Sequence, residues 1–119
     1  MASAHINPQE LAHGVALFNQ GKFFDAHEVL EDIWRAAPTG QKKFFQGLVQ
    51  VAVAFHHYST GNRVGMKSVM ARAAKNLTEG KSSFDGIRLE ALLQSLAAWE
   101  KAMDNNGAPP ALPQIESAD

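Results

Sequence analysis

The chain of 119 residues contains no cysteine, which excludes disulfide bonds and thiolate chemistry and fits a reducing compartment. It has no excess of one charge: 11 Lys and Arg residues against 12 Asp and Glu residues give a formal net charge of −1, so no general attraction to nucleic acid is expected. The longest apolar stretch, residues 48–55, is too short to cross a bilayer. The first residues lack a basic segment followed by an apolar run, so no secretory signal is expected. We therefore expect a soluble, cytoplasmic protein with no nucleic-acid or membrane partner.

Helix signals dominate the chain, and no run of residues favours a strand. Asn7 precedes Pro8, which predicts an N-cap followed by a proline in the first helical turn, and Gly21 ends this first helix. A second helix is expected over residues 22–37. Its apolar residues recur at helical spacing up to Pro38, and a proline disfavours helical backbone in the residue before it.

Three further helices are predicted in the rest of the chain. Thr39 is placed to cap a third helix, which is apolar nearly all round, so we expect it to be the most buried. A fourth helix follows the turn at residues 61–62 and closes at Gly80. Asp85 is placed to cap a fifth, which ends at residues 105–107.

The sequence therefore predicts an all-α fold, a compact irregular array of about five helices built from antiparallel helical hairpins, in one domain over residues 1–104. Residues 105–119 contain three prolines and show no periodicity, which predicts an extended or disordered C-terminal tail. Leu112 and Ile115 are the tail residues that could dock on the helices.

Polar side chains interrupt the apolar side of the second helix. Helical geometry places His27 and Glu31 on that side, four residues apart and within reach of each other. Trp34 lies on the same side, and we expect it in the core beside His27. Glu28 projects toward the charged side and is the weaker candidate. Burying an unpaired polar group costs about 1–3 kcal/mol, so these side chains either bond to each other or line a site.

The third helix carries a narrow polar stripe of Lys43, Gln46, Gln50 and His57. The plainest interpretation is that this stripe is the exposed side of the helix. Against it, small residues such as Gly47 lie beside the two glutamines and permit another helix or a ligand to approach closely. Glutamines four residues apart can also present a set of hydrogen-bond donors and acceptors.

Several motifs together resemble a known family. They are Phe18-Asn19-Gln20-Gly21, Phe23-Phe24-Asp25-Ala26-His27-Glu28-Val29-Leu30-Glu31, Trp34-Arg35, Gln46-Gly47-Leu48-Val49-Gln50, His57 and Gly61-Asn62. Over about residues 11–77 the chain resembles the domain-of-unknown-function family 309, a small all-helical family of prokaryotes. The resemblance implies a compact helical array and no particular activity, because none is established for the family. It also implies the signature positions His27, Glu28, Glu31, Trp34, Gln46, Gln50, His57 and Asn62, and His56 departs from the pattern by standing where an aromatic residue is expected.

An enzyme site can be built from these residues in two ways. His27, His57 and Glu31 are a ligand set that can hold a divalent metal and leave positions open for water or substrate. The short connection at residues 38–40 makes the second and third helices antiparallel neighbours, which permits that grouping. Without a metal, Glu31 or Glu28 would orient an imidazole as a general base. The candidate ligand-binding residues are Glu28, Trp34, Gln46, Gln50 and Asn62.

These observations leave the biochemical role undetermined and favour a binding or scaffold protein. Its candidate polar pocket lies between the second and third helices and consists of His27, Glu31, Gln50 and His57. The partner would be a small ligand, a peptide or a second copy of the chain. The alternative is a metal-dependent or acid–base hydrolase-like enzyme that uses His27, Glu31 and His57 as catalytic or metal-binding groups. A further interpretation is a polar network that holds the helices in register.

Overall fold

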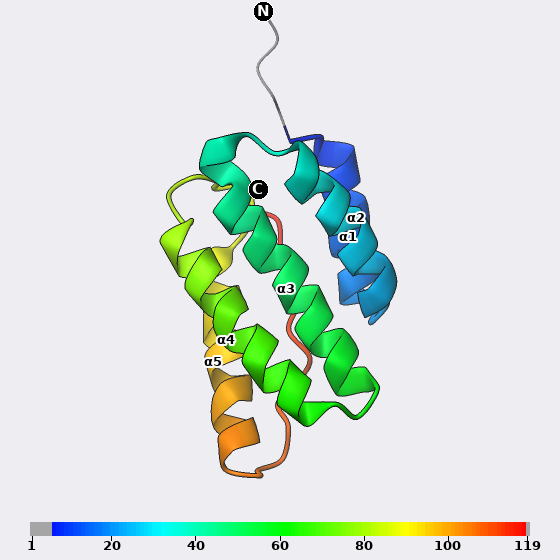
Figure 1. Cartoon of the computed structure of the whole chain (residues 1–119), viewed down its shortest axis with the longest axis vertical. Helices are drawn as coiled ribbons and strands as arrows, with labels where there is room; N and C mark the ends of the chain where they lie inside the picture. The colour runs from blue at the N-terminus through cyan, green and yellow to red at the C-terminus, as the bar shows by residue number, and fades with distance from the viewer. Residues whose placement is uncertain (1–5, 119) are drawn as a thin grey trace, which may run out of the picture.

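The computed structural model describes residues 6–118 and contains five α-helices. They are α1 (Pro8–Asn19), α2 (Phe23–Ala36), α3 (Lys42–Ser59), α4 (Arg63–Glu79) and α5 (Leu89–Asp104), with a short 3-10 turn, η1 (Thr39–Gln41), before α3. The described residues contain no strand, only an isolated bridge between Ile87 and Ser117. The predicted all-α fold of about five helices is therefore confirmed (Figure 1). The chain start, where no secretory signal is expected, lies outside the described residues.

One of the three predicted N-caps is present. The side-chain oxygen of Asn7 accepts hydrogen bonds from the backbone N–H groups of Gln9 and Glu10, and Pro8 occupies the first turn of α1. A cap that was not predicted is present at the start of α4, where the side chain of Asn62 accepts a bond of 2.8 Å from the N–H of Gly65. Each bond spans at most three residues, so the local sequence determines it.

The other two predicted caps are wrong. Thr39 begins the 3-10 turn, and α3 starts three residues later with no side-chain cap. Asp85 does not cap α5, which begins at Leu89. The N–H of Arg88 donates 2.9 Å to the carbonyl oxygen of Glu116, which ties the backbone just before α5 to the C-terminal segment. This long-range contact keeps residues 86–88 out of the helix.

The connections α1–α2 and α3–α4 have the same geometry. Gly21 and Gly61 follow their helices with φ values of +80° and +82°, a region that glycine adopts without a steric penalty. The next N–H in each turn, from Lys22 or Asn62, donates back to a carbonyl in the last helical turn. Both connections therefore produce antiparallel hairpins (Figure 1).

Helix α3 lies at the centre of the core, as predicted from its apolar surface. Nine of its eighteen residues are buried, against three or four in each other helix. The ring of Phe55 lies 6.2 Å from that of Phe18 in α1 and 5.1 Å from that of Trp99 in α5. These aromatic contacts join the two outer helices to the central one.

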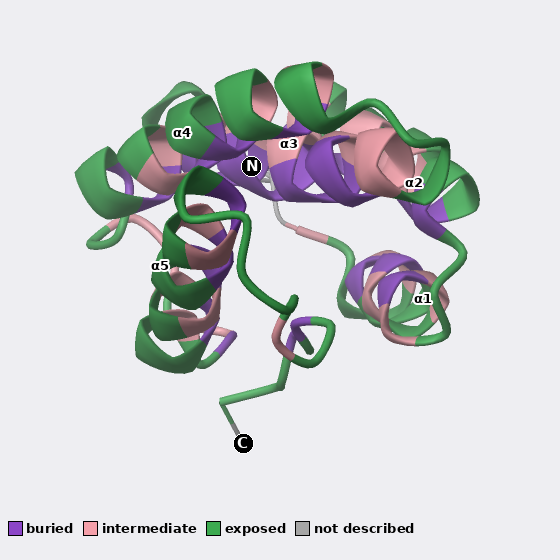
Figure 2. Cartoon of the chain, turned by 90° about the horizontal axis from the view of Figure 1, so that it is seen from below, coloured by how far each residue is buried: buried purple, intermediate pink, exposed green. Residues whose placement is uncertain are grey.

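The helices form two layers (Figure 2). Helices α2, α3 and α4 make one layer, while α1 and α5 lie apart from each other on the same side of it. The C-terminal segment runs between α1 and α5, and its Ile115 is buried with 1% of its surface exposed. The division into a domain over residues 1–104 and a tail over 105–119 stays a prediction. None of the helices in the described residues is long and apolar enough to span a membrane.

Candidate functional site

His27 is half-buried near the start of α2, beside an exposed aromatic side chain. Its Nδ1 donates to the carbonyl oxygen of Phe24 at 3.2 Å. The Phe24 ring, 51% exposed, lies 5.4 Å from the ring of His27 and 5.4 Å from that of His56 on α3. His27 therefore shares a surface cluster with Phe24 and His56, the histidine that departs from the family pattern.

His57 and Asn62 form a contact at the end of the α3–α4 hairpin. The Asn62 side-chain nitrogen lies 3.4 Å from Nδ1 of His57, so the amide donates to the imidazole. The same amide caps α4 through its oxygen. His57 also lies beside His56, with ring centroids 6.4 Å apart. Its immediate role is to support the turn between the two helices.

Glu31 has its partner on its own helix. Its carboxylate forms an ion pair of 3.0 Å with the guanidinium of Arg35, which also lies 3.5 Å from the carboxylate of Asp32. Glu28 is exposed on α2, as its predicted direction implied. The acidic groups of this helix therefore face water and a local cation.

Trp34 is half-buried at the edge of the core, so its predicted place inside the core is wrong. The Lys42 ammonium lies 5.7 Å from the centre of the indole ring. The same ammonium donates 2.8 Å hydrogen bonds to the carbonyl oxygens of Trp34 and Arg35 in the last turn of α2. Lys42 therefore holds one face of Trp34 in a cation–π contact, and the fully buried tryptophan is Trp99.

The polar side chain of Gln50 joins α3 to α4. Gln50 accepts a hydrogen bond of 2.8 Å from the Asn76 side chain on α4. Gln46, one turn earlier on α3, is half-buried. At the start of α3, Lys43 donates to the carboxylate of Glu79 at 2.8 Å. This hydrogen bond is the largest cause of the lowered pKa of Glu79, and Coulombic attraction to Lys43 and to Lys75 lowers that pKa further.

Each residue of the predicted polar pocket thus contacts a different partner: this holds for His27, Glu31, Gln50 and His57. Among residues 6–118, no three His, Asp or Glu side chains are grouped so that they could hold a metal ion. The structure therefore does not assemble His27, Glu31 and His57 into a ligand set. None of the four lines either of the cavities described below.

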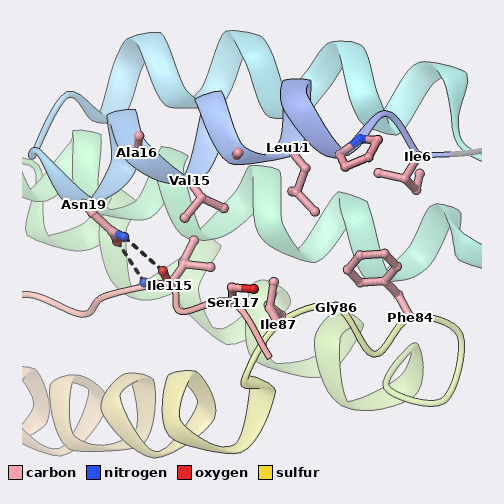
Figure 3. A pocket seen from close by; sticks show the side chains of 12 residues that line it. Ile6, Leu11, Val15, Ala16, Asn19, Phe84, Gly86, Ile87, Ile115 and Ser117 are labelled. Carbon is pink, nitrogen blue, oxygen red and sulfur yellow. Dashed lines mark hydrogen bonds between the residues drawn. The ribbon is translucent and has the colours of Figure 1, made fainter. Parts of the chain in front are cut away.

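The main cavity lies between α1, the loop before α5 and the C-terminal segment (Figure 3). Its volume is about 570 Å³, within the range of small-ligand sites. A second cavity of about 160 Å³ lies near Ile6 and Ile33. The side chains that line the main cavity are mostly apolar and include Leu11, Val15, Phe84, Ile87 and Ile115.

Asn19 is the polar side chain that fixes the geometry at this cavity. Its amide nitrogen donates to the carbonyl oxygen of Ile115 at 2.9 Å, and its amide oxygen accepts from the N–H of Ile115 at 2.8 Å (Figure 3). The two residues are 96 positions apart in the chain. This site was not predicted from the sequence. The signal that the sequence contains is a pair of apolar residues on α1, Leu11 and Val15, spaced four residues apart.

Comparisons with known proteins agree with the motifs in the sequence. Two uncharacterised bacterial proteins are similar to the chain. One from Aquifex aeolicus (strain VF5) is 33% identical over 73 residues, which is 60% of this chain and 22% of that protein. The other, YpuF of Bacillus subtilis (strain 168), is 31% identical over 69 residues, 57% of this chain and 40% of that protein. The matched segments thus cover less than half the length of each of these relatives.

The pattern of a domain of unknown function, DUF309, matches residues 11–69, from the first turn of α1 into α4. The resemblance stated from the motifs is confirmed. Through this segment the chain belongs to the DUF309 family.

Proposed function

We propose that the protein is a non-catalytic binding module whose ligand site is the cleft between α1 and the C-terminal segment. The observation that carries this proposal is the open cavity of about 570 Å³ with a mainly apolar lining. Burying apolar surface is the main driving force for ligand binding, and a ligand would find that surface already assembled by helix and loop.

The lining of the cavity favours binding over catalysis. Its polar side chains are those of Asn19 and Ser117, and none of the described residues that line it is an acid, a base or a histidine. A general acid or base must stand within hydrogen-bond reach of the reacting group. The titratable side chains His27 and Glu31 do not line this cavity. Their local contacts are consistent with a structural role.

The proposal is tested by filling the cavity. Ala12 is exposed on α1 and lines the cavity, so Ala12→Trp places an indole in it without replacing a core residue. The matched control is Ala71→Trp on the exposed side of α4, which carries the same loss of helix propensity.

The probe is anilinonaphthalene sulfonate, whose fluorescence rises in apolar sites. We expect saturable binding of one probe molecule to the unaltered chain and to Ala71→Trp, and about ten-fold weaker binding to Ala12→Trp, a loss of about 1.4 kcal/mol. Equal affinity in all three proteins would show that the cavity is not the binding site.

A further inference from the structure

The C-terminal segment, residues 109–118, is held in its groove by contacts to its backbone. The Asn19 amide bonds to both the N–H and the carbonyl oxygen of Ile115. The indole N–H of Trp99 on α5 donates to the carbonyl oxygen of Ala111 at 2.9 Å. These side chains come from opposite walls of the groove and recognise groups that every residue except proline carries.

The loop before α5 adds two more backbone contacts. The N–H of Arg88 donates to the carbonyl oxygen of Glu116 at 2.9 Å, and the N–H of Ala118 donates to the carbonyl oxygen of Gly86 at 3.1 Å. These bonds flank the antiparallel bridge between Ile87 and Ser117. The segment is therefore bound in the way that an extended peptide is bound by the edge of a sheet.

Few side chains of the segment contribute to this binding. Ile115 is 1% exposed and Pro113 is also buried, whereas Leu112 is 44% exposed and Gln114 and Glu116 face solvent. Binding of a segment in this groove therefore needs an extended backbone. It also needs two buried side chains, a proline and an aliphatic residue two positions after it. Many sequences meet that requirement.

We propose that this groove is a binding site for an extended peptide segment of a partner protein, with an aliphatic side chain at the position of Ile115. Residues 109–118 are the intramolecular competitor that occupies the groove when the partner is absent. This inference goes beyond the proposed binding function, because its site is the groove that the tail fills, next to the cleft. The cleft beside α1 opens onto Ile115 and Ser117, so an incoming aliphatic side chain can enter next to the one it replaces.

The tethered tail weakens binding of a partner peptide by a factor that can be calculated. A short tether, here residues 105–108 after α5, gives an effective concentration on the order of 1 mM. For a peptide that binds the empty groove with a Kd of about 0.1 mM, such a competitor weakens apparent binding about ten-fold. Release of the tail should therefore strengthen binding by about that factor.

The experiment uses the full chain and a fluorescein-labelled synthetic peptide of residues 108–118. Ile115→Asp makes the docked tail unfavourable, because a carboxylate would have to be buried among apolar groups. Leu112→Asp is the matched control, since the same charge enters the same segment at an exposed position. Fluorescence anisotropy gives the Kd of the peptide for each protein.

We expect the peptide to bind Ile115→Asp about ten-fold more tightly than it binds the unaltered chain or Leu112→Asp. Adding Asn19→Ala to Ile115→Asp should weaken that binding again, and a peptide that itself carries Ile115→Asp should not bind. Equal affinities for Ile115→Asp and the unaltered chain would overturn the proposal. So would a dimer of the unaltered chain with exchanged tails, because the occupant would then be a second copy.

Hydrogen exchange on the unaltered chain covers the case in which Ile115→Asp does not fold. A displaceable tail lets the N–H of Ile115 exchange faster than core amides of α3 such as that of Val51. Exchange of both amides at the same rate, only through global unfolding, would overturn the proposal. Probe binding that is sensitive to Ala12→Trp, combined with no peptide binding, would overturn this inference and leave the binding function intact.

Discussion

Replacing Asn19 by alanine removes two hydrogen bonds at once and tests how the C-terminal segment is held. Both bonds go to the backbone of Ile115, which is 1% exposed, so the freed N–H and carbonyl oxygen would face a nearly dry environment. An unsatisfied buried polar group costs about 1–3 kcal/mol, which gives about 2–6 kcal/mol if the segment stays in place.

The segment has an alternative that limits this cost. It can leave the groove, and the loss is then the free energy that docking contributes. Burying an isoleucine side chain contributes about 1.5–3 kcal/mol, and each of the few other hydrogen bonds adds about 1 kcal/mol or less. Part of this gain is offset by the entropy of ordering the segment. We therefore expect Asn19→Ala to lower the free energy of unfolding by about 1–2 kcal/mol.

The assay is urea unfolding followed by circular dichroism, with Gln20→Ala as the control at the exposed neighbouring position. The control should change stability by less than about 0.5 kcal/mol. The double variant Asn19→Ala/Ile115→Ala should cost less than the sum of the single variants, because both act through the same docked segment. A loss below about 0.5 kcal/mol for Asn19→Ala would refute the reasoning.

Three further predictions concern the helices. Trp99→Ala should cost about 3–5 kcal/mol in the same assay because the indole is 1% exposed, and Trp34→Ala clearly less because Trp34 is half-buried; equal losses would contradict these placements. Gly47→Ala should destabilise the fold by about 1 kcal/mol or more, even after the gain in helix propensity, since the new Cβ would lie 3.0 Å from a backbone nitrogen of α4; increased stability would contradict this close approach. The hydrogen bond from Lys43 lowers the pKa of Glu79, so the contribution of this pair to stability is present at neutral pH and is lost as the pH falls through that pKa. In an NMR titration, Lys43→Ala should raise the pKa of Glu79, and an unchanged pKa would contradict the pairing.

Local signals in the sequence predict helices well and their caps only in part. Asn7 and Asn62 cap their helices through bonds to N–H groups two or three residues away, so the information lies in neighbouring residues. Asp85 has the same local signature and does not act as a cap. Its loop pairs with residues 116–118, and no local pattern contains that contact.

The candidate polar pocket was also predicted from local patterns, which do not contain the long-range contacts of its side chains. Helical periodicity places His27 and Glu31 on one side of α2, but it does not choose their partners. Glu31 finds Arg35 four residues further along its own helix, and Gln50 finds Asn76 on α4 instead of α2. A polar residue near the surface needs only one good partner, and the nearest one on the same helix or hairpin costs the least chain entropy. The facing of two helices therefore does not by itself bring their polar residues into one site.

Asn19 connects the family segment to the rest of the chain. It lies in the Phe18-Asn19-Gln20-Gly21 motif and inside residues 11–69, the part that matches DUF309, whereas Ile115 and Trp99 lie outside it. The family segment thus contributes one wall of the groove, and a later part of the chain contributes both the other wall and the bound backbone. Because the Asn19 amide recognises a backbone and not a particular side chain, this wall does not require the sequence of residues 109–118. The wall and its occupant are therefore physically separable, and that separability is the property that exchange of the tail for a partner's peptide requires.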